Sequence, residues 1–319
     1  MMASECTRAP GRVNPLHRVV AVVVTYYPPV GRLPQLLRAL EGQVAQVVVV
    51  DNGSSLWEEP SCQMPLRVVH HPHNIGLAAA QNDGLRMALA QGATHVLLLD
   101  QDSQPEGGMV ALLLDAFQRA STPGGPVAAV GPSVIDPRGV FEGFVRFDEG
   151  RYRVAPLLPG EPWVECDMLI SSGCLIPCDV LDRVGLMLAP LFIDKIDTEW
   201  SLRAKAQGFR LLGAPAARMN HCLGERHVRL WFGGWRELPL HRPFRYYYMV
   251  RNSILLHRLP HAHPAWRRAD RRQLLSLLLY FGLLAPGRGQ VLRMMCRGLY
   301  DGLRNRSGPL NAKVNQSHR

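Results

Sequence analysis

The sequence predicts an α/β protein with a doubly wound, mostly parallel sheet and a basic helical C-terminal appendage. Through the first half of the 319 residues, short β-branched runs alternate with segments of helical periodicity. This is the pattern of strands covered by helices on both faces. Beyond about residue 222, segments rich in arginine and histidine follow. We therefore expect an N-terminal extension over 1–18, an α/β domain over 19–222 and a basic helical region over 223–319.

Continuous apolar runs mark the expected strands of the first half. They are VVAVVVT (19–25), QVVVVDNGSS (46–55), THVLLLDQDS (94–103) and PVAAVGPSVI (126–135). The segments between them carry leucine or alanine at helical spacing: RLPQLLRALEG (32–42), NIGLAAAQNDGLRMALAQG (74–92) and GGMVALLLDAFQRA (107–120). Gly42 and Gly92 stand where two of these helices should end, as glycine commonly does.

The regular alternation weakens after the fourth strand. Residues 133–165 read as short β-like pieces with turns, and 191–208 as a loop and a helix that ends at Gly208. FRLLGAP (209–215) and ARMNH (217–221) look like two short strands. After about residue 223 we expect helices.

Charge is distributed unevenly along the chain. Residues 1–202 hold 14 Lys/Arg and 22 Asp/Glu, whereas residues 203–319 hold 22 Lys/Arg and 4 Asp/Glu. A basic flank of this kind suggests attraction to an anionic surface, lipid or nucleic acid, although a solvated basic face is the alternative.

Cysteine usage and hydropathy favour a cytoplasmic protein. Seven cysteines without a CxxC pair fit reduced thiols better than a disulfide framework or a zinc site. The N-terminus lacks the apolar core of a secretory signal. LLSLLLYFGLLA (274–285) is 12 residues long, too short for a transmembrane helix of about 20, so we expect a core or interfacial segment.

Acidic residues close two of the buried strands. Asp51 follows four valines, and Asp100 and Asp102 follow Val96–Leu99. In open α/β sheets, ligands bind beyond the carboxyl ends of the strands. Two acids at i and i+2 of an extended segment lie on the same side, and a divalent cation relieves their mutual repulsion. The sequence therefore predicts Mg²⁺ or Mn²⁺ bound here together with substrate phosphates.

Several ordered motifs together resemble inverting GT-A glycosyltransferases of family 2, especially bacterial dTDP-L-rhamnose-dependent rhamnosyltransferases of O-antigen and rhamnolipid synthesis. The motifs are VVVVDNGSS, HNIGLAAAQNDGL, LLLDQDS, LISSGCLI, FIDKIDTEWSLRAKAQGFR, NHCLGE, PFRYYYMVRN and CRGLYDGL. The resemblance spans about residues 19–309. It implies a Rossmann-like GT-A fold and dTDP-L-rhamnose as donor, with another dTDP-, UDP- or GDP-sugar as the alternative. The implied acceptor is a lipid-linked saccharide or glycolipid.

The resemblance also implies roles for individual residues. The nucleotide-sugar site would comprise Thr25, Tyr27, Asp51, Asn52, Asn74, Gly76, Asn82, Asp100 and Gln101, with Asp51 on the base imide and Gly76 allowing close backbone approach. The metal site would comprise Asp102, Asp100 and His221. Asp197 would be the catalytic base, with Glu199 orienting the acceptor, and Ser171, Ser172, Gly173 and Arg251 would face the acceptor.

Chemistry explains why such a site needs a cation and one acid. The departing diphosphate gains negative charge, which a bound cation stabilises in place of a general acid. A single carboxylate then suffices to deprotonate the attacking hydroxyl, which gives inversion of configuration.

Alternatives stay open at three positions. Many members of the wider superfamily carry Glu-Asp where Ile196 precedes Asp197 here, which leaves Asp194 as a rival base or a loop-ordering acid. Asp197 begins a predicted helix and could be its N-cap. His221 could be an ordinary hydrogen-bonded histidine.

The C-terminal segment 289–306 predicts a basic amphipathic helix. Its apolar face would carry Leu292, Met295, Cys296, Leu299 and Leu303. Such a helix fits peripheral docking on the inner face of the cytoplasmic membrane, or packing on its own domain. Tyr246–Tyr248, Arg251 and Asn252 would shape the acceptor mouth or pack the appendage.

Two other functions are disfavoured. A nucleic-acid-binding module lacks an RNP, KH, zinc-finger or helix-turn-helix signature. A sugar nucleotidyltransferase would need a glycine-rich basic loop where TYYPPVGR stands after the first strand.

Overall fold

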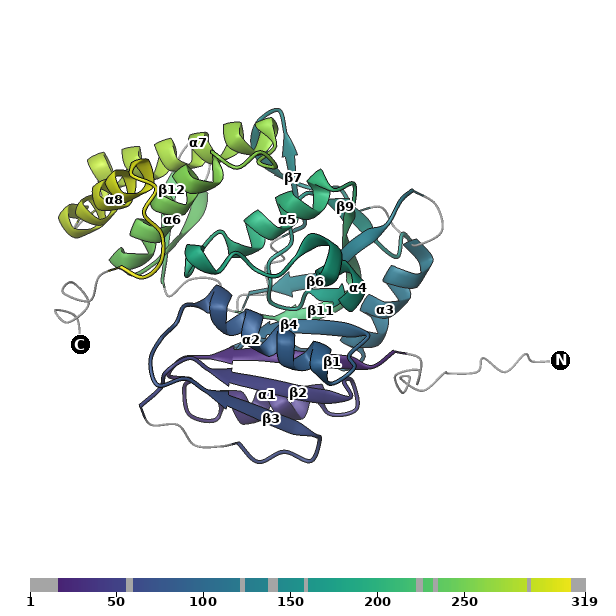
Figure 1. Ribbon diagram of the computed structural model, residues 1–319. Helices are drawn as coiled ribbons and strands as arrows, with labels where there is room; N and C mark the ends of the chain where they lie inside the picture. Colours follow the sequence, from purple (N-terminus) through teal and green to yellow (C-terminus); the bar gives the residue numbers. More distant parts are fainter. Residues whose placement is uncertain are drawn as a thin grey trace.

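A large sheet covered on both faces by helices forms the body of the protein, and the C-terminal helices gather at one side of it (Figure 1). The computed structural model describes residues 17–55, 60–120, 124–136, 143–157, 160–221, 226–231, 235–285 and 288–310. The expected N-terminal extension lies almost entirely outside these ranges. The fold is α/β with a mostly parallel central sheet, as the sequence predicts.

Within the described ranges, the main sheet has nine strands in the order β3-β2-β1-β4-β10-β6-β11-β5, and β9 also pairs with β11. Strands β1 to β4, β6 and β11 run parallel, whereas β5, β9 and β10 are antiparallel to their neighbours. The strands are β1 (Val19–Thr25), β2 (Gln46–Asp51), β3 (Leu66–His70), β4 (His95–Asp100), β5 (Gln104–Pro105), β6 (Val127–Ile135), β7 (Val145–Asp148), β8 (Arg151–Val154), β9 (Val164–Cys166), β10 (Leu175–Pro177), β11 (Arg210–Asn220), β12 (Arg226–Trp231) and β13 (Trp235–Leu240).

The helices lie on the two faces of this sheet and at its side. They are α1 (Arg32–Leu40), α2 (Leu77–Ala90), α3 (Met109–Ala120), α4 (Cys178–Val184), η1 (Ala189–Leu191), α5 (Ile196–Ala206), α6 (Pro243–Leu256), α7 (Pro264–Leu279), the π-helical turn η2 (Tyr280–Leu284) and α8 (Arg288–Leu303).

Alternate residues of the central strands contribute to hydrophobic cores on opposite faces of the sheet. On one face, Val20 and Val22 of β1 pack with α2, α4 and α5. On the other face, Val19, Ala21 and Val23 pack with α1 and α3. The alternation follows from strand geometry, since successive side chains of a strand point to opposite faces. A sheet buried on both sides therefore needs the unbroken apolar runs that the sequence shows.

Pairing between the strands brings their carboxyl ends to one edge of the sheet. Thr25 of β1 is in register with Asp51 of β2, and Val24 is in register with Asp100 of β4. At the other end of the strand order, Asn220 of β11 pairs with Gln104 of β5. Because β5 begins shortly after β4, this pairing brings the end of β11 close to the acidic residues that follow β4.

Two regions in the C-terminal half of the chain differ from the sequence prediction. Residues 210–220 form one long strand, β11, with a register irregularity between Ala214 and Arg218, instead of two short strands. Strands β12 and β13 pair antiparallel, where helix was expected. The glycines at 233 and 234, between two strand-like runs of the sequence, are a hairpin signal that outweighs the high arginine content.

The C-terminal helices form a small core of their own. Tyr246 and Val250 of α6 pack with Leu277 of α7, Phe281 of η2 and Met295 of α8. Within the described ranges, none of the helices has the length and apolar content needed to cross a membrane.

Candidate active site

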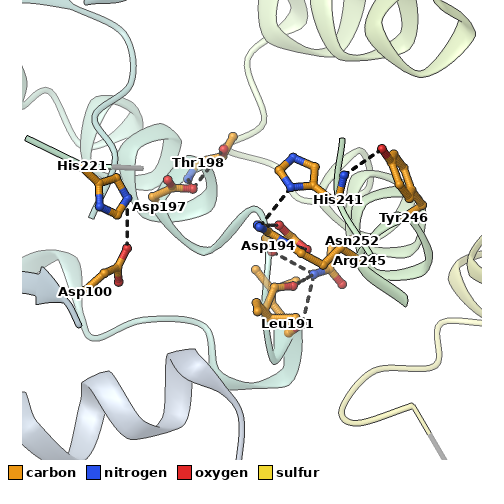
Figure 2. A network of polar contacts seen from close by, with 11 residues as sticks. Asp100, Leu191, Asp194, Asp197, Thr198, His221, His241, Arg245, Tyr246 and Asn252 are labelled. Carbon is orange, nitrogen blue, oxygen red and sulfur yellow. Dashed lines mark hydrogen bonds and ion pairs between the residues drawn. The ribbon is translucent and has the colours of Figure 1, made fainter. Parts of the chain in front are cut away.

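The structure brings Asp100, Asp102 and His221 together at the carboxyl edge of the sheet. The Nε2 atom of His221 lies 3.7 Å from Asp100 Oδ2, and its Nδ1 atom lies 3.4 Å from Asp102 Oδ1. One potential ligand atom from each residue falls within 4.8 Å of the others. Figure 2 shows His221 facing Asp100. Two carboxylates and an imidazole at this spacing fit Mn²⁺ or Mg²⁺.

Electrostatics at this edge also favour a cation. Burial raises the pKa of Asp100, His221 lowers it in part, and the charge of Asp102 raises it again. A divalent ion would relieve both the desolvation and the repulsion between the two carboxylates. Ser172 supports the site, since the Asp100 backbone N–H donates to Ser172 Oγ at 3.2 Å and the Ser103 and Ser172 hydroxyls lie 2.5 Å apart.

Asp51 lies in a second cluster at the same edge and is fully buried. Its carboxylate accepts hydrogen bonds from Thr25 Oγ1 (3.2 Å), from the Ser54 hydroxyl (2.6 Å) and from the Ser54 N–H (2.9 Å). His70 Nδ1 lies 2.9 Å from Asp51 Oδ2. The His70 side chain is 47% exposed, whereas Thr25 and Ser54 are buried, so His70 is the partner that a ligand could most easily displace.

Sequence reasoning missed Ser54 and His70 as site residues. Ser54 falls within the VVVVDNGSS motif and could have been read as a turn hydroxyl that bonds the preceding aspartate. His70 closes β3, the strand next to β2, and is in register with Asp51. The sequence analysis does not identify LRVVH as a strand, so it could not place His70 beside Asp51.

Two tyrosines flank the Asp51 cluster and are about half exposed. The Tyr27 N–H donates to Ser54 Oγ at 2.8 Å, and the Tyr26 N–H donates to Gln101 Oε1 at 2.8 Å. The two rings pack edge to face with centroids 4.8 Å apart. Gln101 therefore braces the loop after β1, and the aromatic faces offer a surface on which a base could stack.

The predicted asparagines hold backbone turns. Asn52 Nδ2 donates to Asn74 Oδ1 at 3.1 Å, and Asn74 Oδ1 also accepts from the Gly76 N–H at 2.8 Å. Asn82 is buried and bonds both the N–H and the carbonyl of Met187. Gly76 has φ of +93°, and a Cβ there would lie 2.6 Å from the Phe192 ring. A side chain at position 76 would therefore collide with the Phe192 ring, which packs closely against this glycine.

Asp197 lies in the first turn of α5. The helix begins at Ile196, so Asp197 is not its N-cap, which answers one of the alternatives left by the sequence. Asp197 Oδ1 accepts from the Thr198 N–H at 2.7 Å, and the described residues give Asp197 no salt-bridge partner. Burial raises the pKa of Asp197, while the Thr198 N–H and the Lys195 ammonium lower it in part.

Asp194 lies in the loop before α5 and has a different environment. Both of its carboxylate oxygens contact the guanidinium of Arg245, at 2.5 and 3.3 Å (Figure 2). The negative charges of Asp194 and Asp100 both raise the pKa of Asp197. The two rival acids therefore differ in their partners, since only Asp194 has a guanidinium on both oxygens.

Two other predicted residues make contacts within the protein. Glu199 is buried, with Arg203 at 2.8 Å and His261 Nε2 at 3.0 Å. Arg251 is fully buried and donates to the carbonyls of Leu191 and Gly308. Both side chains are thus occupied by contacts that hold elements of the protein together.

The turn of Ser171, Ser172 and Gly173 is tied to the strand that carries Asp100. Gly173 has φ of +83°, and a Cβ there would lie 2.6 Å from Pro132. Its N–H donates to the Leu98 carbonyl at 2.7 Å. Because Leu98 precedes Asp100 on β4, this turn helps to fix the position of the acidic edge.

Similarity to known proteins identifies the family. A model of glycosyl transferase family 2 matches residues 21–135. Over 247 residues, the chain is 31% identical to dTDP-rhamnosyl transferase RfbF of Shigella flexneri, covering 76% of this chain and 81% of that one. The chain belongs to glycosyltransferase family 2. This glycosyltransferase is also 32% identical over 156 residues to the pre-mycofactocin glycosyltransferase of Mycobacterium tuberculosis, covering 46% of this chain and 31% of that one.

Solved structures share the fold of this glycosyltransferase. GalNAc-T7 with UDP, GalNAc and Mn²⁺ superposes with a TM-score of 0.53 and 15% identity, covering 84% of this chain and 56% of that one. Residues 1–349 of S. aureus TarS with UDP-GlcNAc give a TM-score of 0.53 and 14% identity, covering 90% and 81%. At these identities the likeness concerns the GT-A fold alone.

Proposed function

We propose that this glycosyltransferase moves L-rhamnose from dTDP-L-rhamnose to a hydroxyl of a lipid-linked saccharide or glycolipid acceptor. The similarity to RfbF over most of both chains carries the proposal. The acid-lined edge beside Asp197 supports it, because it offers a place for a nucleotide diphosphate next to a carboxylate that can act as a base.

Asp100, Asp102 and His221 would hold Mg²⁺ or Mn²⁺ at the donor diphosphate. When bound, the ion would offset the negative charge that develops on the departing nucleotide. His221 would bind a cation through a neutral ring nitrogen, and Ser172 holds the backbone of Asp100 in place. Thr25, Asp51 and Tyr27 would bind the base of the nucleotide. The imide of the base would replace His70 as a partner of the Asp51 carboxylate.

Asp197 would deprotonate the acceptor hydroxyl as it attacks the sugar. A base must be unprotonated and free to accept a proton. Asp194 is the weaker candidate because Arg245 contacts both of its oxygens. Attack from the face opposite the diphosphate in a single displacement gives inversion of configuration.

The deciding experiment is a donor screen by calorimetry, with and without Mn²⁺, on the wild type and on Asp102→Asn. dTDP-L-rhamnose should bind more tightly than UDP- or GDP-sugars, and Asp102→Asn should lose the metal-dependent part of that affinity. Asp115→Asn is the control, since this acid is exposed on α3 and pairs with Arg119. A preference for a UDP- or GDP-sugar would overturn dTDP-L-rhamnose as the donor, but it would not contradict the proposed glycosyl transfer.

The acceptor proposal extends to an anionic membrane surface. Leu275, Leu278, Leu279 and Leu283 of α7 and η2 are between 45% and 70% exposed, and they lie at helical spacing along one strip. The exposed Arg271 precedes the strip. Exposed apolar side chains next to a basic residue suit the interface of anionic lipid, and this surface would bring a lipid-linked acceptor to the enzyme at the cytoplasmic face.

This strip differs from the predicted one on α8. Met295 is buried against α6 and Leu292 is partly buried, whereas Cys296, Leu299 and Leu303 are exposed. Helix α8 therefore uses part of its apolar face for packing, and α7 with η2 supplies the longer exposed strip.

A further inference from the structure

The loop before α5 has an unusual backbone. Phe192, Asp194 and Lys195 all have positive φ, at 69°, 67° and 62°. Residues other than glycine rarely adopt this region and persist there only when their surroundings hold them. The loop leads directly into Ile196 and Asp197, so its geometry fixes where the Asp197 carboxylate lies.

The side-chain amide of Asn252, on α6, donates to backbone carbonyls of this loop (Figure 2). Its Nδ2 atom lies 3.0 Å from the Leu191 carbonyl, 2.8 Å from that of Ile193 and 2.9 Å from that of Asp194. Its Oδ1 atom accepts from Arg251 Nε at 2.9 Å, which fixes the orientation of the amide. Asn252 is fully buried, so water cannot readily replace it as the donor to these carbonyls.

Side-chain contacts from α6 and α7 hold the same loop. The Phe192 and Tyr248 rings stack with centroids 5.3 Å apart, and Arg245 pairs with Asp194. Lys195 Nζ lies 2.7 Å from Asp270 of α7. These contacts restrain side chains of the loop, whereas Asn252 contacts its backbone carbonyls directly.

We propose that Asn252 is a positioning residue for Asp197: its buried amide holds the loop carbonyls in the conformation that presents the Asp197 carboxylate to the acceptor. The inference rests on the proposed role of Asp197. It makes the C-terminal region part of the active-site framework. A misplacement of about 1 Å in a reacting group costs about 10²-fold in rate, so the loop conformation should affect turnover more than donor binding.

The test compares Asn252→Asp with Asn305→Asp. The aspartate keeps the shape of Asn252 and its acceptor for Arg251, but places an oxygen against the three carbonyls. Asn305→Asp makes the same chemical change at an exposed residue that follows α8, and it leaves the contacts of Asn252 in place. Asn252→Ala, which removes the donor without adding charge, is the second variant should Asn252→Asp fail to fold.

The measurements are kcat, donor affinity by calorimetry, and amide hydrogen exchange over residues 192–199. For Asn252→Asp, kcat should fall about 10²-fold, exchange should accelerate, and donor affinity should stay close to that of the wild type. Asn305→Asp should leave all three unchanged. Equal effects of the two variants, or a loss of donor affinity as large as the loss of kcat, would overturn the positioning role.

Asp197→Asn, measured in parallel, separates the two hypotheses. If it retains turnover, the base assignment fails, and the role proposed for Asn252 fails with it. If Asp197→Asn is inactive while Asn252→Asp turns over normally, the base assignment stands and the positioning role is wrong.

Discussion

Arg245 of α6 contacts both carboxylate oxygens of Asp194, which lies 51 residues earlier in the chain. The pair joins the C-terminal helices to the loop that leads into Asp197. It also distinguishes the two acids that the sequence leaves as rival bases. Asp194 forms an ion pair with the Arg245 guanidinium, whereas Asp197 accepts a hydrogen bond from the Thr198 N–H.

Replacement of these two acids should therefore have unequal effects. Asp197→Asn should reduce kcat by about 10³-fold, within the usual contribution of a general base, and should leave donor binding intact. Asp194→Asn should stay within about tenfold of the wild type, since it weakens one side-chain contact of the loop and leaves the loop carbonyls held by Asn252. Steady-state kinetics on both variants test this, and the reverse order would make Asp194 the base.

On acidification, kcat should begin to fall at a higher pH than it would if the base were a solvent-exposed aspartate. Burial raises the pKa of Asp197 above its usual 3.8, and the base works only when unprotonated. The acidic limb of the kcat profile should therefore lie above about pH 4. A limb at or below that value would show a well-solvated carboxylate or a different base.

The same shift predicts how stability depends on pH. Because folding raises the pKa of Asp197, the folded state binds the proton more tightly, and stability is lost as pH rises from 3.8 to the folded pKa. Asp197→Asn should be more stable than the wild type to urea at pH 7, by about 1.4 kcal/mol for each pH unit of that rise. The difference should shrink in acid; a constant difference would point to packing instead.

A buried ion pair between Lys195 and Asp270 should matter for folding. Asp270 is fully buried, with Lys195 at 2.7 Å and His257 at 2.9 Å. Burial alone would lower the pKa of Lys195, but the Asp270 carboxylate raises it, so the pair stays ionised. Asp270→Asn should lower the free energy of unfolding in urea by about 3 kcal/mol, as expected when one member of a buried pair is removed.

The exposed pair of Asp115 and Arg119 gives the matched comparison for that measurement. Asp115→Asn should change the free energy of unfolding by less than about 1 kcal/mol. Equal losses in the two variants would mean that the Lys195–Asp270 pair contributes no more than a surface contact.

Vesicle binding should depend on the exposed strip of α7 and η2. The double variant Leu279→Glu with Leu283→Glu should weaken co-sedimentation with phosphatidylglycerol vesicles by about tenfold or more, since each buried leucine is worth about 1.5–3 kcal/mol. Leu112→Glu, which alters an exposed leucine on α3, is the control. Equal binding by both variants, or equal binding to neutral vesicles, would remove this surface from the proposal.

The sequence by itself determined the sheet and its acidic edge. Unbroken apolar runs must be buried on both faces, and parallel strands end at one edge, so Asp51 and Asp100 could be placed there from local pattern alone. The glycines at 233 and 234 carried a hairpin signal that the arginine-rich surroundings concealed.

Tertiary structure alone decided what surrounds Asp197. Glu199 follows it by two residues, yet its carboxylate contacts His261, which lies far along the chain beyond α6. Asn252 and Asp270 reach the loop from helices that lie far along the chain. No local periodicity encodes such contacts, because they depend on how separately formed helices dock and on which buried polar groups must then be paired.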